Sequence, residues 1–191
     1  MAKNGWIEVI CGPMFAGKSE ELIRRANRLG YAKKKFLVFK PAIDVRYSLD
    51  QVVSHNKRSL KSINIKCARE IYNYVDDTID AVVIDEVQFL DKEVINVAED
   101  LANKGIRVIC GGLDMDFKGE PFENTSLLLA RAEKIDKLTA ICVICGEPAT
   151  RSQRLVNGLP ASENDDIISI GGKESYEPRC RKCHQLKKLG K

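Results

Sequence analysis

The sequence predicts an α/β fold in which a parallel β-sheet is covered by helices on both faces. The first observation is that short apolar segments rich in β-branched residues are typical of buried strands. The second is that these segments alternate along the chain with segments whose apolar residues recur at helical spacing. The chain has 191 residues, of which 44% are hydrophobic and 30% charged. This length and composition suit one ordinary domain with a small appendage that can bury a core.

The expected elements follow one another as strand and helix. Strands are expected at Trp6–Cys11, Lys35–Lys40 (ended by Pro41), Ala81–Ile84 and Ile106–Cys110, with a further short one near Ile63–Ile65. Helices are expected after residue 18, at Ala68–Val75, around Val94–Leu101 with Gly105 where it stops, and at Thr125–Ala132. The polar segment Pro41–Lys61 is expected to be an irregular connection.

The first helix has a clear apolar face. Leu22, Ile23, Ala26 and Leu29 fall at helical spacing, and Arg24, Arg25 and Arg28 are expected to lie mostly in solvent.

A glycine-rich segment, Gly12–Ser19, joins the first strand to this helix. Its residues, Gly-Pro-Met-Phe-Ala-Gly-Lys-Ser, fit the phosphate-binding loop pattern G-x-x-x-x-G-K-[ST] at every fixed position. The glycines allow close backbone approach, and the amides at the helix N-terminus point toward phosphate oxygens. Lys18 would contact the β- and γ-phosphates, and the Ser19 hydroxyl would ligate Mg²⁺. The chain is therefore expected to have a P-loop fold of the RecA-like kind.

Two carboxylates, Asp85 and Glu86, end the Ala81–Ile84 strand. Because ligands gather at the carboxyl ends of parallel strands, Asp85 is expected beside the phosphate loop as the acidic residue that holds Mg²⁺. Glu86 would be free to accept a proton from a hydroxyl or a water. The alternative is a pair of acidic residues that only cap a turn.

The seven cysteines fall into two groups. Cys11, Cys67 and Cys110 lie in or beside apolar segments and are expected to be buried thiols. Cys142 and Cys145 form one C-x-x-C pair, and Cys180 and Cys183 form another, with residues 146–179 between them. Two such pairs predict a tetrahedral Zn²⁺ site with no open position, and hence a structural zinc. The alternatives are a disulfide or redox pair, and His184 as a ligand in place of Cys183.

The long insertion between the two cysteine pairs contains an apolar run with two glycines, Ile167–Gly172, followed by Tyr176. Such a backbone can turn sharply and present its own amides and carbonyls to a planar base. Composition alone indicates only a loop on a zinc ribbon.

Charge and hydropathy limit the kinds of partner that the sequence predicts. The chain carries 31 Lys and Arg against 27 Asp and Glu residues, a formal net charge of +4. Basic residues cluster at 33–35 and 179–191 without interleaved aromatics, so we expect no nucleic-acid partner. No apolar run is long enough to span a bilayer, and the first residues lack a secretory signal, so we expect no membrane association and a cytoplasmic location.

Over nearly its full length, the chain resembles the cytosolic, zinc-containing type II thymidine kinases. The residues that carry the resemblance are Gly12–Ser19, Asp85–Phe89, Leu113–Phe117 and Gly172–His184. It implies transfer of the γ-phosphate of ATP to the 5′-hydroxyl of thymidine. It also implies a homotetramer and feedback inhibition by dTTP. The implied organisation is a nucleotide-binding domain over residues 1–138 and a zinc-binding domain with a lasso-like loop over residues 139–191.

The resemblance also assigns site residues. Glu86 corresponds to the proton acceptor. The ATP-binding set is Gly12, Pro13, Met14, Phe15, Ala16, Gly17, Lys18, Ser19, Asp44, Arg46, Asp85 and Gln88. The thymidine-binding set is Met14, Phe89, Leu113, Phe117, Ser152, Ile167, Ile168, Ser169, Ile170, Gly171 and Tyr176. Ser152 stands where the family usually has threonine near the thymine methyl, which keeps the hydroxyl but loses a methyl.

Two other functions fit some of the same residues. Asp85-Glu-Val-Gln88 also fits the D-E-x-[HQ] box of nucleic-acid-dependent ATPases, in which Glu86 would activate water. Such motors need a second sheet domain, for which this chain has no room. A zinc-stabilised nucleotide-binding regulator would have the same parts without needing Glu86.

Overall fold

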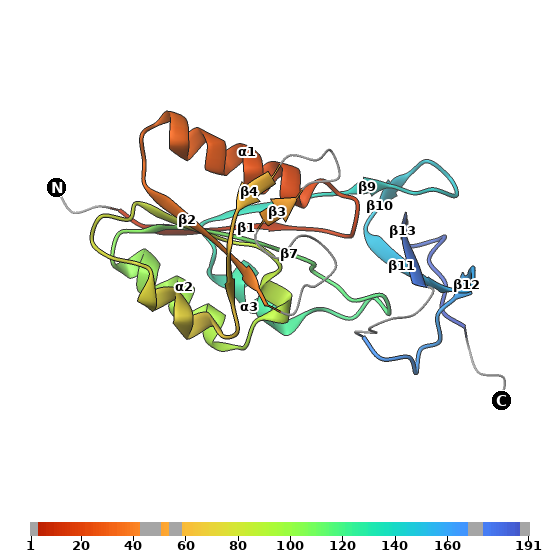
Figure 1. The fold of residues 1–191 in the computed structure, drawn as a ribbon. Coiled ribbons are helices and arrows are strands. Elements are labelled where there is room, and N and C mark those ends of the chain that lie inside the picture. Colours follow the sequence, from red (N-terminus) through yellow and green to blue (C-terminus); the bar gives the residue numbers. More distant parts are fainter. Residues whose placement is uncertain (1–3, 43–50, 54–58, 168–173, 188–191) are drawn as a thin grey trace.

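The fold is described from a computed structural model, which describes residues 4–42, 51–53, 59–167 and 174–187. Its centre is a six-stranded sheet of order β5-β2-β6-β7-β1-β8, in which every neighbouring pair is parallel (Figure 1). The strands are β1 Trp6–Cys11, β2 Phe36–Pro41, β5 Ile63–Ile65, β6 Ala81–Ile84, β7 Arg107–Gly112 and β8 Lys134–Lys137. The predicted parallel α/β fold is confirmed.

Helices cover both faces of this sheet (Figure 1). Helix α1 (Lys18–Tyr31) lies on one face, and α2 (Glu93–Asn103) and α3 (Glu123–Arg131) lie on the other with the 3₁₀ helix η1 (Ala68–Asn73). Alternate residues of each strand face opposite layers. In β7, Ile109 packs with α1, whereas Val108 and Cys110 pack with the α2 and α3 side. Burial on both faces explains why the inner strands are mostly apolar along their whole length.

Several boundaries differ from the sequence expectation. Strand β2 runs through Pro41, which pairs with Ile65 of the neighbouring strand. The segment expected to be irregular contains the antiparallel pair β3 (Gln51–Val53) and β4 (Ser59–Lys61). The helix expected at Ala68–Val75 is a shorter 3₁₀ helix. Strand β8, Lys-Ile-Asp-Lys, was not predicted, because an exposed edge strand of this composition has no apolar pattern.

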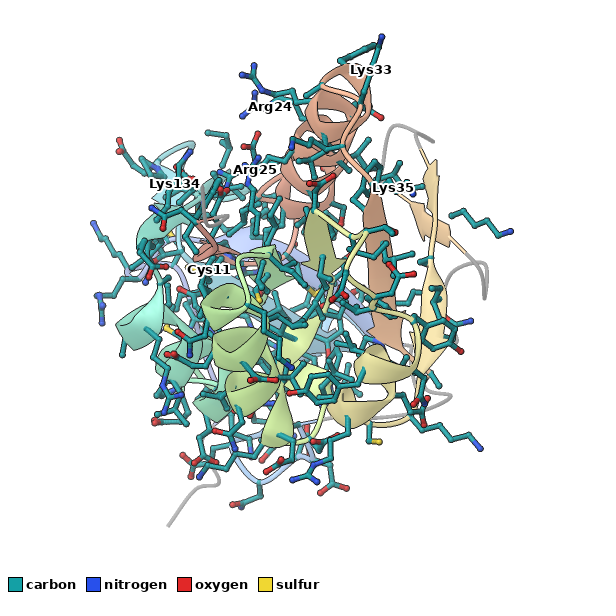
Figure 2. All side chains as sticks on the ribbon, turned by 90° about the vertical axis from the view of Figure 1, so that its left-hand side faces the viewer. Cys11, Arg24, Arg25, Lys33, Lys35 and Lys134 are labelled. Carbon is teal, nitrogen blue, oxygen red and sulfur yellow. The ribbon has the colours of Figure 1, made fainter. Side chains whose placement is uncertain are left out.

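The expectation that Arg25 faces solvent is wrong. Arg25 is buried, and its guanidinium binds the carboxylates of Glu8, Glu21 and Asp136. It lies three residues after Leu22, on the inner side of α1, so the ion pairs compensate for its burial. In Figure 2 the neighbouring Arg24 extends outward from the same helix.

The chain after β8 forms a smaller all-β module beside the carboxyl edge of the main sheet (Figure 1). A hairpin of β9 (Ala140–Ile141) and β10 (Pro148–Ala149) precedes an antiparallel sheet of order β12-β11-β13. Its strands are β11 Arg151–Val156, β12 Leu159–Pro160 and β13 Glu174–Arg179. Within the described residues, every helix is too short or too polar to cross a membrane.

Candidate functional site: a phosphate loop beside a four-cysteine cluster

The loop between β1 and α1 has the backbone conformation that its glycines permit. Gly12 has φ of 139° and Gly17, the residue before the helix, has φ of 83°. A β-carbon on Gly12 would lie 2.4 Å from the Leu138 carbonyl oxygen, so a side chain cannot be placed there without moving the backbone. The glycine pattern is therefore required by both torsion and packing.

Lys18 lies at the start of α1, and its side chain folds back over the loop. Its ammonium donates a hydrogen bond to the Pro13 carbonyl at 2.7 Å. Burial lowers the pKa of Lys18, and the nearby carboxylates of Glu86 and Asp85 oppose that change. Ser19 follows Lys18 in the first helical turn and is partly buried. The ammonium can thus exchange a loop carbonyl for a phosphate oxygen.

Asp85 and Glu86 follow β6, which β7 separates from β1. Two glycines of β7 make space for the side chains that follow β6. A β-carbon on Gly111 would lie 3.3 Å from Asp85 Oδ1, and one on Gly112 would lie 2.5 Å from Gln88 Oε1. The Asp85 carboxylate is buried and accepts a hydrogen bond from the Glu86 amide at 3.0 Å. Asp85 therefore ends a strand at the same sheet edge as the loop.

Glu86 adopts a left-handed backbone conformation, with φ of 53°, immediately before the 3₁₀ helix η2 (Val87–Phe89). This conformation is uncommon for a residue with a side chain and concentrates at functional sites. The Glu86 carboxylate accepts a hydrogen bond from the Gln88 amide group. Gln88 Oε1 in turn accepts from the Leu113 amide at 3.1 Å. Gln88 thus orients Glu86 and ties it to the loop after β7.

That loop carries Phe117, which is buried. The Arg154 guanidinium carbon lies 5.0 Å from the centre of its ring, and His184 Nε2 lies 2.8 Å from its carbonyl oxygen. Both partners come from the C-terminal module. Burial lowers the pKa of His184, which favours the neutral imidazole.

The remaining predicted residues, on the base side and on the phosphate side, fall into three groups. Met14, Leu113, Phe89 and Tyr176 are partly buried, Phe89 packs edge-on against Phe122, and Ile167 is exposed. Ser152 is buried and contacts the phosphate loop, as described below. Asp44, Arg46, Ile168, Ser169, Ile170 and Gly171 lie outside the described residues.

Two contacts join the C-terminal module to the phosphate loop. The Ser152 hydroxyl accepts a hydrogen bond from the Met14 amide at 3.0 Å. Ala16 packs against the small apolar cluster of Ala140, Cys142 and Ala149, to which Cys180 and Cys183 also belong. The C-terminal module, which contains the four cysteines, is therefore packed directly on the phosphate loop. The sequence did not predict these contacts, because the residues they join are far apart along the chain.

The four cysteines of the two C-x-x-C pairs converge as predicted. The sulfur atoms of Cys142, Cys145, Cys180 and Cys183 all lie within 4.8 Å of one another. Cys145 and Cys180 sulfurs are 3.6 Å apart, too far for a disulfide and near the roughly 3.8 Å edge of a tetrahedral zinc–thiolate site. All the cysteines are free thiols. His184 is outside this cluster.

The four thiols of the cluster differ in how readily they ionise. Desolvation opposes ionisation of Cys142, but hydrogen bonds from the backbone at Cys180, Cys145 and Ile144 lower its pKa to about 6. A thiolate is the form that binds a metal ion. A backbone hydrogen bond from Cys183 also lowers the pKa of Cys180, whereas hydrogen bonds with the Cys180 and Cys145 thiols raise the pKa of Cys183 to about 12.

The cysteines outside the cluster are mostly buried. Burial raises the pKa of Cys11 to about 11 and that of Cys110 to about 12, as expected of inert core thiols. Cys67 is only half-buried, contrary to expectation, because it precedes η1 at the edge of the helix layer.

An ion pair between an exposed lysine and a buried carboxylate was not predicted. Lys137 of β8 pairs with the buried Asp114 carboxylate, after β7, at 2.8 Å. Strand β1 lies between those two strands, so the pair spans the end of β1. Asp114 is also one of the negative charges that act on Lys18.

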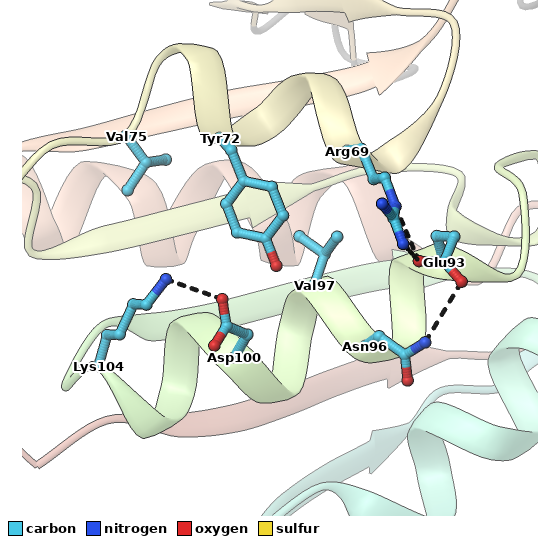
Figure 3. Close-up of a pocket in the computed structure, with 8 residues that line it drawn as sticks. All are labelled: Arg69, Tyr72, Val75, Glu93, Asn96, Val97, Asp100 and Lys104. Atoms are coloured by element: carbon cyan, nitrogen blue, oxygen red, sulfur yellow. Dashed lines mark hydrogen bonds and ion pairs between the residues drawn. The ribbon is translucent and has the colours of Figure 1, made fainter.

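A separate hollow of about 730 Å³ lies between η1 and α2 (Figure 3). Its lining side chains pair with each other, Arg69 with Glu93 and Lys104 with Asp100. The Lys104 ammonium also lies 5.3 Å from the centre of the Tyr72 ring. None of the predicted site residues lines this hollow.

The parallel sheet and the loop that joins β1 to α1 define a P-loop nucleotide-binding fold. A sequence model of the thymidine kinase family matches residues 5–184. The chain belongs to the thymidine kinase family. Among solved structures, it is similar to domain III of the Thermotoga maritima replication initiation protein DnaA, with a TM-score of 0.41 and 15% sequence identity. That match covers 70% of this chain and 55% of the other, so the chain spans about half the length of this structural relative.

Proposed function

We propose that this chain is an ATP-dependent thymidine kinase, which transfers the γ-phosphate of ATP to the 5′-hydroxyl of thymidine and yields dTMP and ADP. The observation that carries the proposal is the packing of the cysteine module on the phosphate loop, through Ser152 and Met14. A protein that only binds or hydrolyses ATP needs no second module there. A kinase needs one, because a second substrate must be held in line with the phosphate.

On the phosphate side, Gly12–Ser19 would hold the ATP phosphates. Lys18 would release the Pro13 carbonyl and bind the β- and γ-phosphate oxygens. The loop amides and the N-terminus of α1 add further positive potential. Phosphoryl transfer depends mainly on alignment of the substrates and neutralisation of phosphate charge. These groups would therefore align ATP and neutralise most of its phosphate charge.

On the acceptor side, Glu86 would remove the proton of the thymidine 5′-hydroxyl. The 5′-oxygen then forms a bond to the γ-phosphorus as the bond to the β,γ-bridging oxygen breaks, and ADP leaves with that electron pair. The proton remains on the Glu86 carboxylate until it passes to solvent. Gln88 supports this role, because it holds the Glu86 side chain from its amide group.

Magnesium would enter with ATP. Ser19 and Asp85 fit it, since a hydroxyl in the first turn of α1 and a buried carboxylate at the end of β6 are oxygen ligands at the same sheet edge. The ion would neutralise charge on the phosphates.

Zinc would be structural. Cys142, Cys145, Cys180 and Cys183 fill all four positions of a tetrahedral site. We assign residues 1–138 to nucleotide binding and residues 139–191 to the zinc module. On the acceptor side we assign Phe89, Leu113, Phe117, Ser152, Ile167–Gly171 and Tyr176, with Asp44 and Arg46 on the phosphate side. Feedback inhibition by dTTP, a homotetramer and a cytoplasmic location belong to the same proposal.

The test is product analysis with γ-labelled ATP, Mg²⁺ and the purified chain, with and without thymidine. We expect label in dTMP, and little free phosphate when thymidine is absent. Free phosphate without dTMP would identify water as the acceptor and favour an ATPase of the D-E-x-Q kind. Binding of ATP without either product would favour a nucleotide-binding regulator.

A further inference from the structure

We propose that Arg154 is a positioning residue for the nucleoside side of the site. It would act by fixing the Phe117 side chain relative to the backbone at Asp166. This inference rests on the proposed kinase function and assigns a residue that the motifs do not contain. Arg154 is buried within β11, the central strand of the β12-β11-β13 sheet.

Arg154 makes two contacts that connect separate segments. Its guanidinium carbon lies 5.0 Å from the centre of the Phe117 ring, which belongs to the loop after β7. Its Nη1 donates a hydrogen bond at 2.5 Å to the carbonyl oxygen of Asp166, one residue before Ile167. One buried side chain thereby joins the main domain to the segment between β12 and β13.

The position of Arg154 on its strand places it toward the proposed site. It follows Ser152 by two residues, and residues two apart on a strand point to the same face. Ser152 contacts the phosphate loop from that face. On the neighbouring strand, Tyr176 lies directly opposite Arg154 in the antiparallel register. The same face of β11 therefore contacts the phosphate side through Ser152 and the Phe117 loop through Arg154.

Arginine suits this position better than lysine. A planar guanidinium can stack on an aromatic ring while its edge donates hydrogen bonds in the plane. A lysine ammonium is compact and strongly hydrated, so it cannot do both from one position. The Phe117 backbone is held independently, because its carbonyl oxygen contacts His184. Loss of Arg154 should therefore free the Phe117 ring without unfolding its loop.

Lys118 offers a matched control. Its ammonium lies 5.4 Å from the centre of the same Phe117 ring and carries the same charge as Arg154. It is partly exposed and sits beside Phe117 in the same loop, so it does not join that loop to the C-terminal module. If only positive charge near the ring mattered, the two residues would be equivalent.

The experiment is steady-state kinetics on the full chain with wild type, Arg154→Met, Arg154→Lys, Lys118→Met, Phe117→Leu and the Arg154→Met/Phe117→Leu double variant. For Arg154→Met we expect the thymidine KM to rise about 10- to 100-fold, since a buried charge-assisted hydrogen bond and a cation over the Phe117 ring are lost. The ATP KM should change less than about twofold. Arg154→Lys should fall between wild type and Arg154→Met, and Lys118→Met should stay within about threefold of wild type.

The double variant tests the route of action. If Arg154 acts through Phe117, the rise in thymidine KM in the double variant should be clearly smaller than the product of the two single effects. Multiplicative effects would overturn the proposal, as would an unchanged thymidine KM in Arg154→Met. Equal increases in both KM values with a lost thermal transition would assign Arg154 to general stability instead. A wild-type chain that makes no dTMP would remove the proposed function and, with it, this inference.

Discussion

The Met14 amide donates a hydrogen bond to the Ser152 hydroxyl across 3.0 Å, and so joins the phosphate loop to a strand 138 residues further along the chain. The amides of such a loop normally point toward phosphate oxygens. Here the Met14 amide instead donates its hydrogen bond to Ser152 of the C-terminal module. The position of that module is thereby coupled to the conformation of the loop, and effects on one part should be measurable in the other.

Glu86→Gln should lower kcat by roughly a hundredfold to ten-thousandfold, because the amide cannot accept the 5′-hydroxyl proton. The shape of the side chain is kept, so the dissociation constant for ATP should stay near that of wild type. Turnover and equilibrium ATP binding would be measured on the same preparation. Glu120→Gln, an exposed change in the loop after β7, is the matched control. Near-wild-type turnover in Glu86→Gln would exclude Glu86 as the proton acceptor.

Freshly purified protein should contain about one zinc ion per chain, because four thiols fill one tetrahedral site. Cys145→Ser should reduce the zinc content and lower the melting temperature, since metal binding contributes to folding. ATP binding should weaken too, through the contacts of the module with Ala16 and Met14. Cys67→Ser, outside the cluster, should keep its zinc. A metal-free wild-type preparation with full stability would contradict this prediction.

Gly12→Ala should destabilise the fold and abolish tight ATP binding. Its φ of 139° is unfavourable for alanine, and the new β-carbon would lie 2.4 Å from the Leu138 carbonyl oxygen. Gly146→Ala is the control, since Gly146 also has a positive φ, 77°, but nothing within 4 Å of the added carbon. We expect about 1–2 kcal/mol of destabilisation for the control from torsion alone, and more for Gly12→Ala. Equal losses in urea unfolding would show that the contact with Leu138 is unimportant.

Arg25→Met should cost about 3–5 kcal/mol of unfolding free energy, because it leaves the buried Glu8 carboxylate with one partner fewer. Arg24→Met removes the neighbouring arginine, which is exposed and pairs with Glu21 at the surface. Solvent screens this exposed pair, so Arg24→Met should lose much less unfolding free energy than Arg25→Met. Urea unfolding of both variants at neutral pH makes the comparison. Similar stability for the two would contradict the assigned burial of Arg25.

The stabilising contribution of Glu21 should depend on pH. Its hydrogen bond from Arg24, helped by Arg25 and opposed by burial, lowers the pKa of Glu21 from 4.5 to about 2. A folded-state pKa below the unfolded value means that the contribution is complete above about pH 5 and is lost as the pH falls toward 2. The difference in unfolding free energy between wild type and Glu21→Gln should therefore be constant from pH 7 to 5 and shrink by pH 3. A difference that does not change over this range would be inconsistent with the lowered pKa.

Much of the fold was predictable because its signals are local. Trp6–Cys11 is apolar except for Glu8, and the loop and α1 follow it directly, so strand, loop and helix could be assigned from adjacent residues. The metal-binding role of the C-x-x-C pairs was equally predictable, because each pair places two ligands on one turn. Strand β8 was missed, since its alternating charged residues sit at the exposed edge of the sheet.

The candidate site was predictable only in part. Arg25 was placed in solvent because charge is usually exposed, whereas three carboxylates from separate segments compensate for its burial. Arg154 was missed for a related reason. The proposed role of Arg154 depends on its contacts with Phe117 and Asp166. No spacing pattern in the sequence predicts those contacts.

By itself the sequence determined the phosphate loop, the two carboxylates at the end of β6, the metal-type cysteine pairs and the resemblance to thymidine kinases. The loop, the two carboxylates and each cysteine pair are encoded by residues within a few positions of one another, where backbone geometry alone limits what they can do, and the resemblance combines several such local motifs. The tertiary structure decided that β7 separates β1 from β6, that its glycines make room for Asp85 and Gln88, and that Ser152 meets Met14. Those relations depend on how distant segments pack, because a hydrogen bond or a van der Waals contact is set by distance in space and not by distance along the chain.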